Sequence, residues 1–105
     1  VLAKKAQEGG YEFRVITNNP PLYTNPSLPF IKNLIQAYEE CTGSKAELLS
    51  MGGGTYCRYV ENTVSFGPVF PGEPMLCHRV DECYDLNLLR LSTKIYARAI
   101  YYLLR

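Results

Sequence analysis

Apolar residues recur every three or four positions from residue 30 to residue 41, which is the spacing of one face of an α-helix. The residues that carry this pattern are Phe30, Ile31, Leu34, Ile35, Tyr38 and Cys41. Ser27 stands before them as a candidate N-cap, and Gly43 follows them where a left-handed residue commonly ends a helix. The sequence therefore predicts a helix over residues 30–41.

The longest predicted element covers residues 86–104, with Asp85 as its candidate N-cap. Its apolar residues form a broad stripe: Leu88, Leu89, Leu91, Ile95, Tyr96, Ala99, Ile100 and Leu103. Arg90, Lys94 and Arg98 follow one another at four-residue intervals on the opposite side. Three like charges placed in this way favour a solvated helix face over a binding patch.

Three other segments have the character of strands. Residues 11–17 alternate between apolar and polar side chains, after one or two predicted helical turns over residues 2–8. Residues 46–51 and residues 63–69 are rich in apolar or β-branched side chains and are bounded by Gly and Pro. Because strands and helices alternate along the chain, we predict the α/β class, with a sheet of a few strands covered by helices.

A connector, residues 18–26, separates the first predicted strand from the first long helix. It contains Pro20 and Pro21. Prolines donate no hydrogen bond to a sheet and push the residue before them out of helical conformation. We therefore expect an extended segment and a domain boundary there.

Composition narrows the classes of protein to consider. The chain has 105 residues, with eleven basic and ten acidic side chains and a net charge of +1. That length suits one hydrophobic core, and that charge provides no field to attract nucleic acid or an anionic membrane. No apolar run approaches the roughly 20 residues that cross a bilayer. The chain begins at Val1 rather than Met, so we expect a piece of a longer protein.

The four cysteines, Cys41, Cys57, Cys77 and Cys83, contain no C-x-x-C pair, and the chain is not dense in disulfides. We therefore expect reduced thiols. A structural zinc site built from the last three cysteines and His78 stays open as an alternative, although adjacent Cys-His ligands fit the usual spacing badly.

Three consecutive glycines, residues 52–54, lie between the predicted strand 46–51 and Thr55. Consecutive glycines weaken a helix or strand interior, so we expect them to allow close approach of the backbone to another group. A short helix over residues 56–60 would let backbone N–H groups hold an anion. A tight strand-to-helix turn explains the same residues, and the pattern matches neither the dinucleotide-binding motif nor the Walker motif.

His78 is the only histidine of the chain, and it lies between a Pro/Gly-rich loop and the last predicted helix. Asp81 and Glu82 would either orient its imidazole or stabilise the first turn of that helix through the helix dipole. One ligand cannot hold zinc, which takes three or four protein groups. Residue chemistry alone therefore indicates an α/β domain with a candidate site.

Several motifs together resemble the C-terminal part of the co-catalytic zinc dipeptidases. They are residues 52–58 (Gly-Gly-Gly-Thr-Tyr-Cys-Arg), residues 66–72 (Phe-Gly-Pro-Val-Phe-Pro-Gly), and then His78 with the Asp-Glu pair at 81–82. These enzymes are the carnosinase-like (Xaa-His) bacterial dipeptidases, which are related to aminoacylase, succinyl-diaminopimelate desuccinylase and glutamate carboxypeptidase. The likeness covers most of the chain from Phe13 onward.

The resemblance implies roles for five residues. His78 matches the histidine that binds one of two zinc ions from the C-terminal segment. Gly53, Gly54 and Thr55 match the loop that lies along the substrate beside the metals. Arg58 matches an arginine that holds a substrate carboxylate or braces the loop. An acidic residue that the broader family often carries just before this arginine is absent here, so both roles of Arg58 stay open.

The implied chemistry is metal-assisted hydrolysis of the peptide bond of a dipeptide. Two zinc ions bind a bridging water, lower its pKa and polarise the scissile carbonyl, while a glutamate takes the proton. The other metal ligands and that glutamate belong to an N-terminal catalytic half that this chain lacks. The resemblance therefore implies a C-terminal fragment that is inactive and binds no zinc by itself.

The resemblance also divides the chain. Residues 1–18 would end a smaller lid domain and form its hinge, and residues 19–105 would be the C-terminal part of a zinc-exopeptidase-like catalytic domain. Residues 20–23 (Pro-Pro-Leu-Tyr) resemble the return of the chain to that domain, and residues 94–101 resemble its terminal helix. Exposed sheet edges in an isolated piece would favour self-association.

We further expect a cytoplasmic parent that binds neither nucleic acid nor membranes. The alternative to a dipeptidase fragment is a small α/β module that binds an anion or a carboxylate without catalysis.

Overall fold

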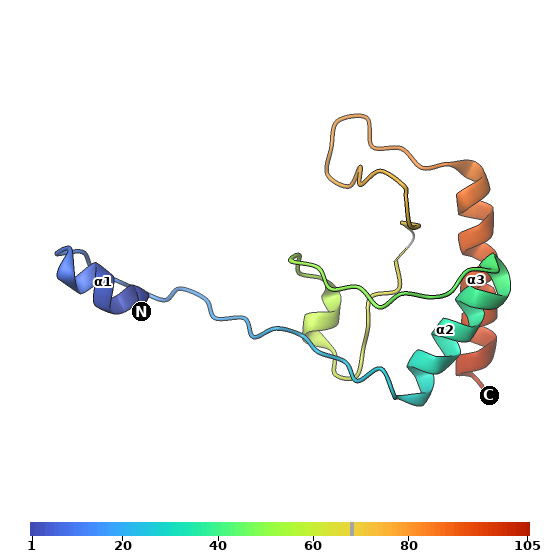
Figure 1. Ribbon diagram of the computed structural model, residues 1–105, viewed down its shortest axis with the longest axis horizontal. Coiled ribbons are helices and arrows are strands. Elements are labelled where there is room, and N and C mark those ends of the chain that lie inside the picture. The colour runs from blue at the N-terminus through green and yellow to red at the C-terminus, as the bar shows by residue number, and fades with distance from the viewer. Residues whose placement is uncertain (68) are drawn as a thin grey trace.

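The computed structural model describes residues 1–67 and 69–105. Residue 68, which belongs to the third predicted strand, lies outside the described residues. A short helix at the N-terminal end is joined by an extended segment to the rest of the chain, where two longer helices lie against each other (Figure 1). The helical elements are α1 (Leu2–Glu8), α2 (Pro29–Thr42), the 3₁₀ helix η1 (Tyr56–Tyr59) and α3 (Leu86–Leu103).

Helix α2 confirms the helix predicted over residues 30–41 and extends it by one residue at each end. Gly43 ends it in the left-handed conformation, with a φ of 69°, and its N–H donates to the Glu39 carbonyl at 2.8 Å. The predicted N-cap is wrong, because Leu28 rather than Ser27 occupies that position and makes no side-chain cap bond. Ser27 lies one residue too early to reach the free N–H groups of the first turn.

Helix α3 confirms the last predicted element to within one residue, and Asp85 caps it as predicted. The Asp85 carboxylate accepts hydrogen bonds from the backbone N–H groups of Asn87 at 2.6 Å and Leu88 at 3.1 Å. Two of the four N–H groups that a helix start leaves unpaired are thereby satisfied. In the described part of the chain, no helix has the length and apolar character required to cross a membrane.

The core is the contact between α2 and α3. Ala37 is 0% exposed and Ala99 is 3% exposed, and these small side chains let the two helices approach closely. Leu34 completes the central cluster, and Phe66 packs against it from the loop between the helices. The Tyr96 hydroxyl donates to the Phe66 carbonyl at 3.1 Å, and the two rings meet edge to face at 5.8 Å. The helix pair therefore holds one end of the loop that continues from the glycines.

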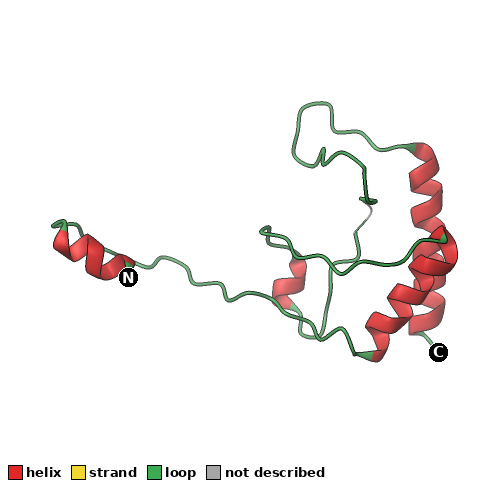
Figure 2. Cartoon of the chain, viewed as in Figure 1, coloured by secondary structure: helices red, strands yellow, loops and turns green. Residues whose placement is uncertain are grey.

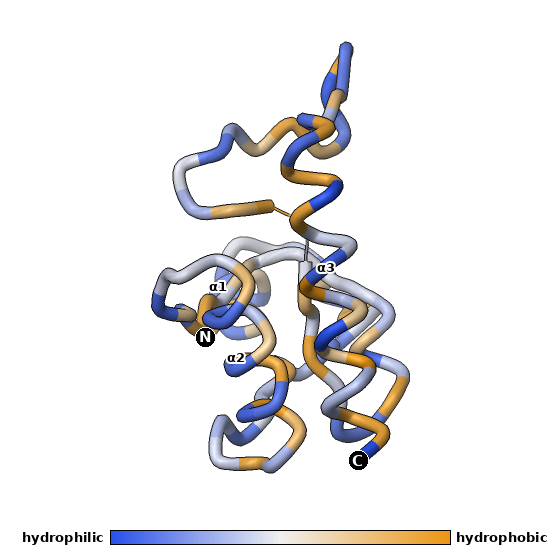
Figure 3. The backbone as a smooth tube through the Cα atoms, turned by 90° about the vertical axis from the view of Figure 1, so that its right-hand side faces the viewer, coloured by the Kyte–Doolittle hydropathy of each residue, from blue (hydrophilic) through white to orange (hydrophobic). Residues whose placement is uncertain are grey.

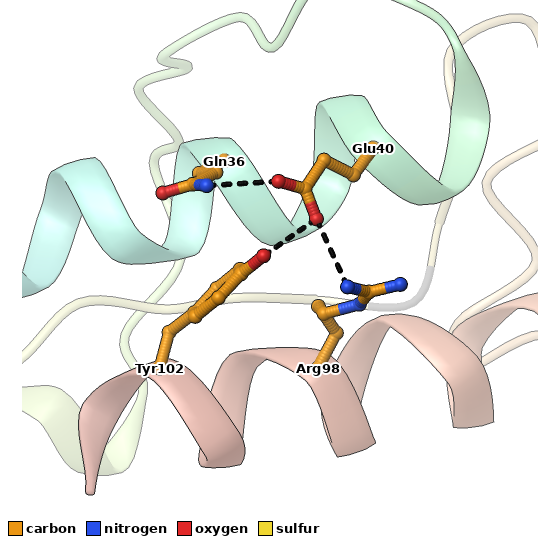
Figure 4. A network of polar contacts seen from close by, with 4 residues as sticks. All are labelled: Gln36, Glu40, Arg98 and Tyr102. Atoms are coloured by element: carbon orange, nitrogen blue, oxygen red, sulfur yellow. Dashed lines mark hydrogen bonds and ion pairs between the residues drawn. The ribbon is translucent and has the colours of Figure 1, made fainter. Parts of the chain in front are cut away.

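A polar cluster also joins the two helices (Figure 4). Glu40 accepts hydrogen bonds from the Tyr102 hydroxyl at 2.7 Å and the Gln36 amide at 2.8 Å, and it pairs with Arg98 at 3.3 Å. The Tyr102 bond first, and then the Gln36 bond, hold the pKa of Glu40 below its ordinary value. Arg98, which the sequence places on a solvated face, therefore also ties α3 to α2.

The predicted sheet is wrong. Among the described residues there is no strand, and residues 11–17, 46–51 and the described part of 63–69 run as loops (Figure 2). Alternating apolar side chains give a segment one face to bury, but a strand also needs a neighbour whose backbone groups complete the hydrogen-bond ladder. None of these segments has such a neighbour in the described chain. The observed class is therefore helical with long loops, not α/β.

The chain is far more open than a globule of its length. Its radius of gyration is 18.9 Å, against about 13 Å for a compact domain of this size. Its accessible surface is 9266 Å², against about 5,900 Å² for a compact monomer of this mass. Apolar stretches lie along the loops as well as on the helices (Figure 3). Large apolar side chains such as Tyr11, Ile16 and Val80 are therefore left in solvent.

Candidate functional site

The glycine-rich turn, residues 52–54, leads directly into η1. The short helix predicted over residues 56–60 is confirmed as a single 3₁₀ turn that ends one residue earlier. Thr55 is the N-cap of this turn, and its Oγ1 accepts the Cys57 N–H at 3.3 Å. The hydroxyl that the sequence places in the site thus orients the backbone of the turn that follows.

The backbone conformation of the turn does not itself require glycine, because none of the three adopts a positive φ. A Cβ built at Gly52 would meet nothing within 4 Å, and one at Gly53 would meet only Met51 Cε, at 3.8 Å. Gly54 is different, because a Cβ there would lie 3.2 Å from Arg58 Nε. Two of the three glycines therefore leave open a surface that contacts within the described chain do not explain.

Ser65 joins the following loop to the glycine-rich turn. Its Oγ lies 3.1 Å from Thr55 Oγ1 and 3.4 Å from Cys57 Sγ. Hydrogen bonds from Ser65 and, to a lesser degree, Thr55 hold the pKa of the Cys57 thiol below its ordinary value. Sequence reasoning missed Ser65, because a single serine ten residues from its partner carries no pattern.

Two hydrogen bonds attach the connector to this same unit. Arg58 Nη1 donates to the carbonyl oxygen of Pro20 at 3.2 Å, and Thr24 Oγ1 donates to the carbonyl oxygen of Thr63 at 2.6 Å. The Thr63 hydroxyl in turn donates to the Val60 carbonyl at 2.8 Å, at the end of η1. Neither threonine could be identified from the sequence. Each one donates to a backbone carbonyl, and every residue carries such a group, so no pair of side chains marks the contact.

His78 lies in a separate loop and is exposed. Its φ of 62° is in the left-handed region, which is uncommon for a residue other than glycine. Its backbone N–H donates to Glu82 Oε2 at 3.2 Å, so Glu82 braces the loop backbone. Within residues 1–67 and 69–105, no hydrogen bond engages the imidazole or links His78 to the glycine-rich turn.

Clustered side chains of the types that bind metals would be the third feature of the site. No group of three or more His, Cys, Asp or Glu side chains that could hold a metal ion occurs in the part of the chain that the structure describes. The alternative zinc site of Cys57, Cys77, His78 and Cys83 is therefore not found there. All four cysteines are free thiols, and Cys77 and Cys83 are exposed.

Comparison with protein-family models matches residues 4–102 to Peptidase family M20/M25/M40. The putative dipeptidase YtjP of Bacillus subtilis (strain 168) is 41% identical over 91 residues, which are 87% of this chain and 20% of the relative. The putative dipeptidase SAUSA300_1697 of Staphylococcus aureus (strain USA300) is 35% identical over 99 residues, which are 94% of this chain and 21% of the relative. No solved structure matches the chain significantly.

The chain spans about a fifth of the length of these curated relatives. The matches confirm the dipeptidase resemblance read from the glycine-rich turn and the motifs after it, and they are consistent with a C-terminal fragment of such a protein. The family model covers nearly the whole chain, including α2, all but the last residue of α3, the glycine-rich turn and His78. The chain therefore belongs to the M20/M25/M40 family of peptidases.

Proposed function

We propose that this chain is the C-terminal portion of a zinc-dependent metallodipeptidase, which hydrolyses the peptide bond of dipeptides. Membership of a peptidase family, and relatives named as putative dipeptidases, support this reaction class. Because the chain spans about a fifth of those relatives, the activity would belong to a longer parent protein. The isolated chain would be inactive.

The observation that carries the proposal is the open surface of the glycine-rich turn. This chain has room for side chains at positions 52 and 53. Glycine at these positions would therefore leave space for a group that binds from outside the chain. In the parent, this group would be the dipeptide substrate, which would lie along Gly53, Gly54 and the Thr55 hydroxyl. Arg58 borders the same surface.

His78 would supply one zinc ligand in the parent. Its ring is exposed, which suits a donor that meets partners from another part of the protein. One imidazole does not hold zinc, so the described residues alone do not fit a zinc centre. The remaining ligands of both zinc ions would have to come from the N-terminal catalytic half of the parent.

The parent would act in the cytoplasm, and the four free thiols support a reducing compartment. Its partners would be the dipeptide substrate and, for this chain, the N-terminal half that completes the site. The net charge of +1 supports no role for nucleic acid or membranes.

The proposal is tested by assaying the parent protein for dipeptide hydrolysis, before and after zinc is removed with a chelator. We expect activity that chelation abolishes and zinc restores. His78→Ala should lower kcat/KM by more than about a hundredfold, because loss of a direct ligand exceeds the cost of losing an outer-shell partner. Arg79→Ala, at the neighbouring exposed position, is the control. Full activity in the His78 variant would overturn the metal role, and no hydrolysis by the wild type would overturn the reaction class.

The isolated chain separates this proposal from the alternative of a small anion-binding or carboxylate-binding module. Acetate and glycylglycine are titrated into the 105-residue chain while its backbone NMR signals are followed. We expect no saturable shift at residues 52–55. Saturable binding of either carboxylate there would favour the module.

A further inference from the structure

The side chain of Arg58 spans the distance from the glycine-rich turn to the connector. Its stem lies over Gly54, since a Cβ at that glycine would be 3.6 Å from Arg58 Cδ and 3.2 Å from Nε. Its far end donates from Nη1 to the Pro20 carbonyl at 3.2 Å, across 38 positions of sequence. One side chain thus touches both the proposed substrate surface and the connector, where the sequence predicts a domain boundary.

We propose that Arg58 is a positioning residue, which fixes the glycine-rich turn to the connector and does not hold the substrate carboxylate. Among the described residues, its guanidinium donates its hydrogen bond to a backbone carbonyl. Pro20 and Pro21 restrict the backbone of the connector at this point, so the carbonyl that accepts the bond is held on a stiff segment. An arginine bonded to a stiff segment is suited to setting the place of the turn it crosses.

A second hydrogen bond between the connector and this unit restricts how the turn can be oriented. Thr24 Oγ1 donates to the Thr63 carbonyl at 2.6 Å, four residues further along the connector. The Thr63 hydroxyl closes onto the Val60 carbonyl at the end of η1. A single hydrogen bond would leave the turn free to rotate about it, whereas two separated bonds restrict that rotation. Movement of the connector would therefore move the glycine-rich turn.

The structural part of this inference is tested on the 105-residue chain by hydrogen exchange, without any assay of activity. In Arg58→Ala, the hydrogen-bonded amides of residues 57 and 58 in η1 should exchange at least about tenfold faster, because the bond that holds this turn to the connector is lost. Amides in the middle of α2 and α3 should be unchanged. Arg14→Ala is the matched control, since Arg14 pairs with a near neighbour in sequence, Glu12, at 3.3 Å. Unchanged exchange in the Arg58 variant would overturn the attachment.

The functional part rests on the proposed dipeptidase activity and is tested in the parent. A dipeptide and its C-terminal amide are compared as substrates or as competitive inhibitors. Arg58→Ala should weaken both by the same factor if the arginine positions the turn. A loss confined to the free carboxylate would overturn the positioning role. Absence of any dipeptide hydrolysis would overturn the proposed function instead, and would leave the exchange result standing.

Discussion

Gly53 and Gly54 are neighbours in sequence, yet their surroundings differ. A Cβ at Gly53 would have one contact, at an ordinary 3.8 Å from Met51 Cε, whereas a Cβ at Gly54 would press on Arg58. Substitution at Gly53 therefore tests contacts with a molecule that binds from outside the chain. Substitution at Gly54 would also displace the Arg58 side chain. This distinction selects Gly53 as the cleaner probe of the substrate surface.

Gly53→Ala should not lower the thermal unfolding midpoint of the 105-residue chain, because the added methyl group meets only Met51 Cε within 4 Å, at an ordinary contact distance of 3.8 Å. In the parent, the same methyl group would meet the dipeptide. A clash of about 1.4 kcal/mol would lower kcat/KM about tenfold. Gly67→Ala, at another glycine whose Cβ would meet nothing within 4 Å, is the control in both measurements. Unaltered kinetics in the Gly53 variant would remove this turn from the substrate site.

Glu40 makes the contact between the long helices sensitive to acid. Its pKa is lowered, first by the Tyr102 hydrogen bond, so the folded state favours the carboxylate. The stabilisation is present above the ordinary glutamate pKa of about 4.3, and it is lost as the pH falls through the lowered value. Helix content should therefore melt at lower temperature as the pH falls through this window.

Glu40→Gln should remove that part of the pH dependence, and circular dichroism at several pH values measures it. Glu61→Gln, at an exposed glutamate outside the helix pair, should behave as the wild type does. An acid transition of equal size in the Glu40 variant would show that other carboxyl groups cause it.

Features made by residues close in sequence were the ones that could be predicted at this scale. Asp85 caps the helix that follows it directly, and Gly43 ends the helix that precedes it. Ser65 and Thr24 could not be found, because their partners lie ten and 39 positions away. Ser27 shows that even capping rules based on nearby residues can fail. The helix begins one residue later than a Ser27 cap requires, so its side chain makes no cap bond.

Among the elements, α2 and α3 form the one pair in close contact within the described chain. Ala37 and Ala99 lie at the centre of their contact, where no space remains for a larger side chain. The closeness of the helices thus depends on two methyl groups. Every loop that carries a candidate site residue begins or ends on this pair.

Ala37→Leu should destabilise the helix pair by about 1–3 kcal/mol, because extra methylene groups in a tight contact force the helices apart. Urea unfolding followed by circular dichroism measures the loss. Ala97→Leu, on the exposed side of α3, makes the same chemical change and should stay within about 0.5 kcal/mol of the wild type. Equal stability of the two variants would contradict the central place of Ala37.

The sequence predicted the helices well and the sheet wrongly, for a physical reason. An α-helix satisfies its backbone groups within itself, so its spacing pattern is enough to reveal it. A strand depends on a neighbour, and residues 11–17 and 46–51 have the right side chains without one in the described chain. Alternating apolar side chains in such segments predict that one face of the segment will be buried. They do not identify the element that buries it.

At the scale of the whole molecule, the accessible surface exceeds that of a compact monomer of this mass by about 3,300 Å². A standard protein–protein interface buries about 1,600 Å² in total. The isolated chain therefore exposes enough surface for more than one such contact, and much of it is apolar.

The isolated chain should self-associate, and light scattering at increasing concentration should give a mass above the 11.9 kDa of the monomer. Addition of the N-terminal portion of the parent should compete with this association, because it would cover the same apolar surface. A single species of monomer mass at high concentration would contradict the prediction.

The helix pair also has a consequence for biosynthesis. The glycine-rich turn and His78 both lie between α2 and α3 in the sequence, and α3 leaves the ribosome after them. At a translation rate of about 5–20 residues per second, these loops would be synthesised seconds before the helix that anchors them. A nascent chain stalled ahead of α3 would therefore expose both loops to proteases and chaperones, and release of α3 would end that exposure.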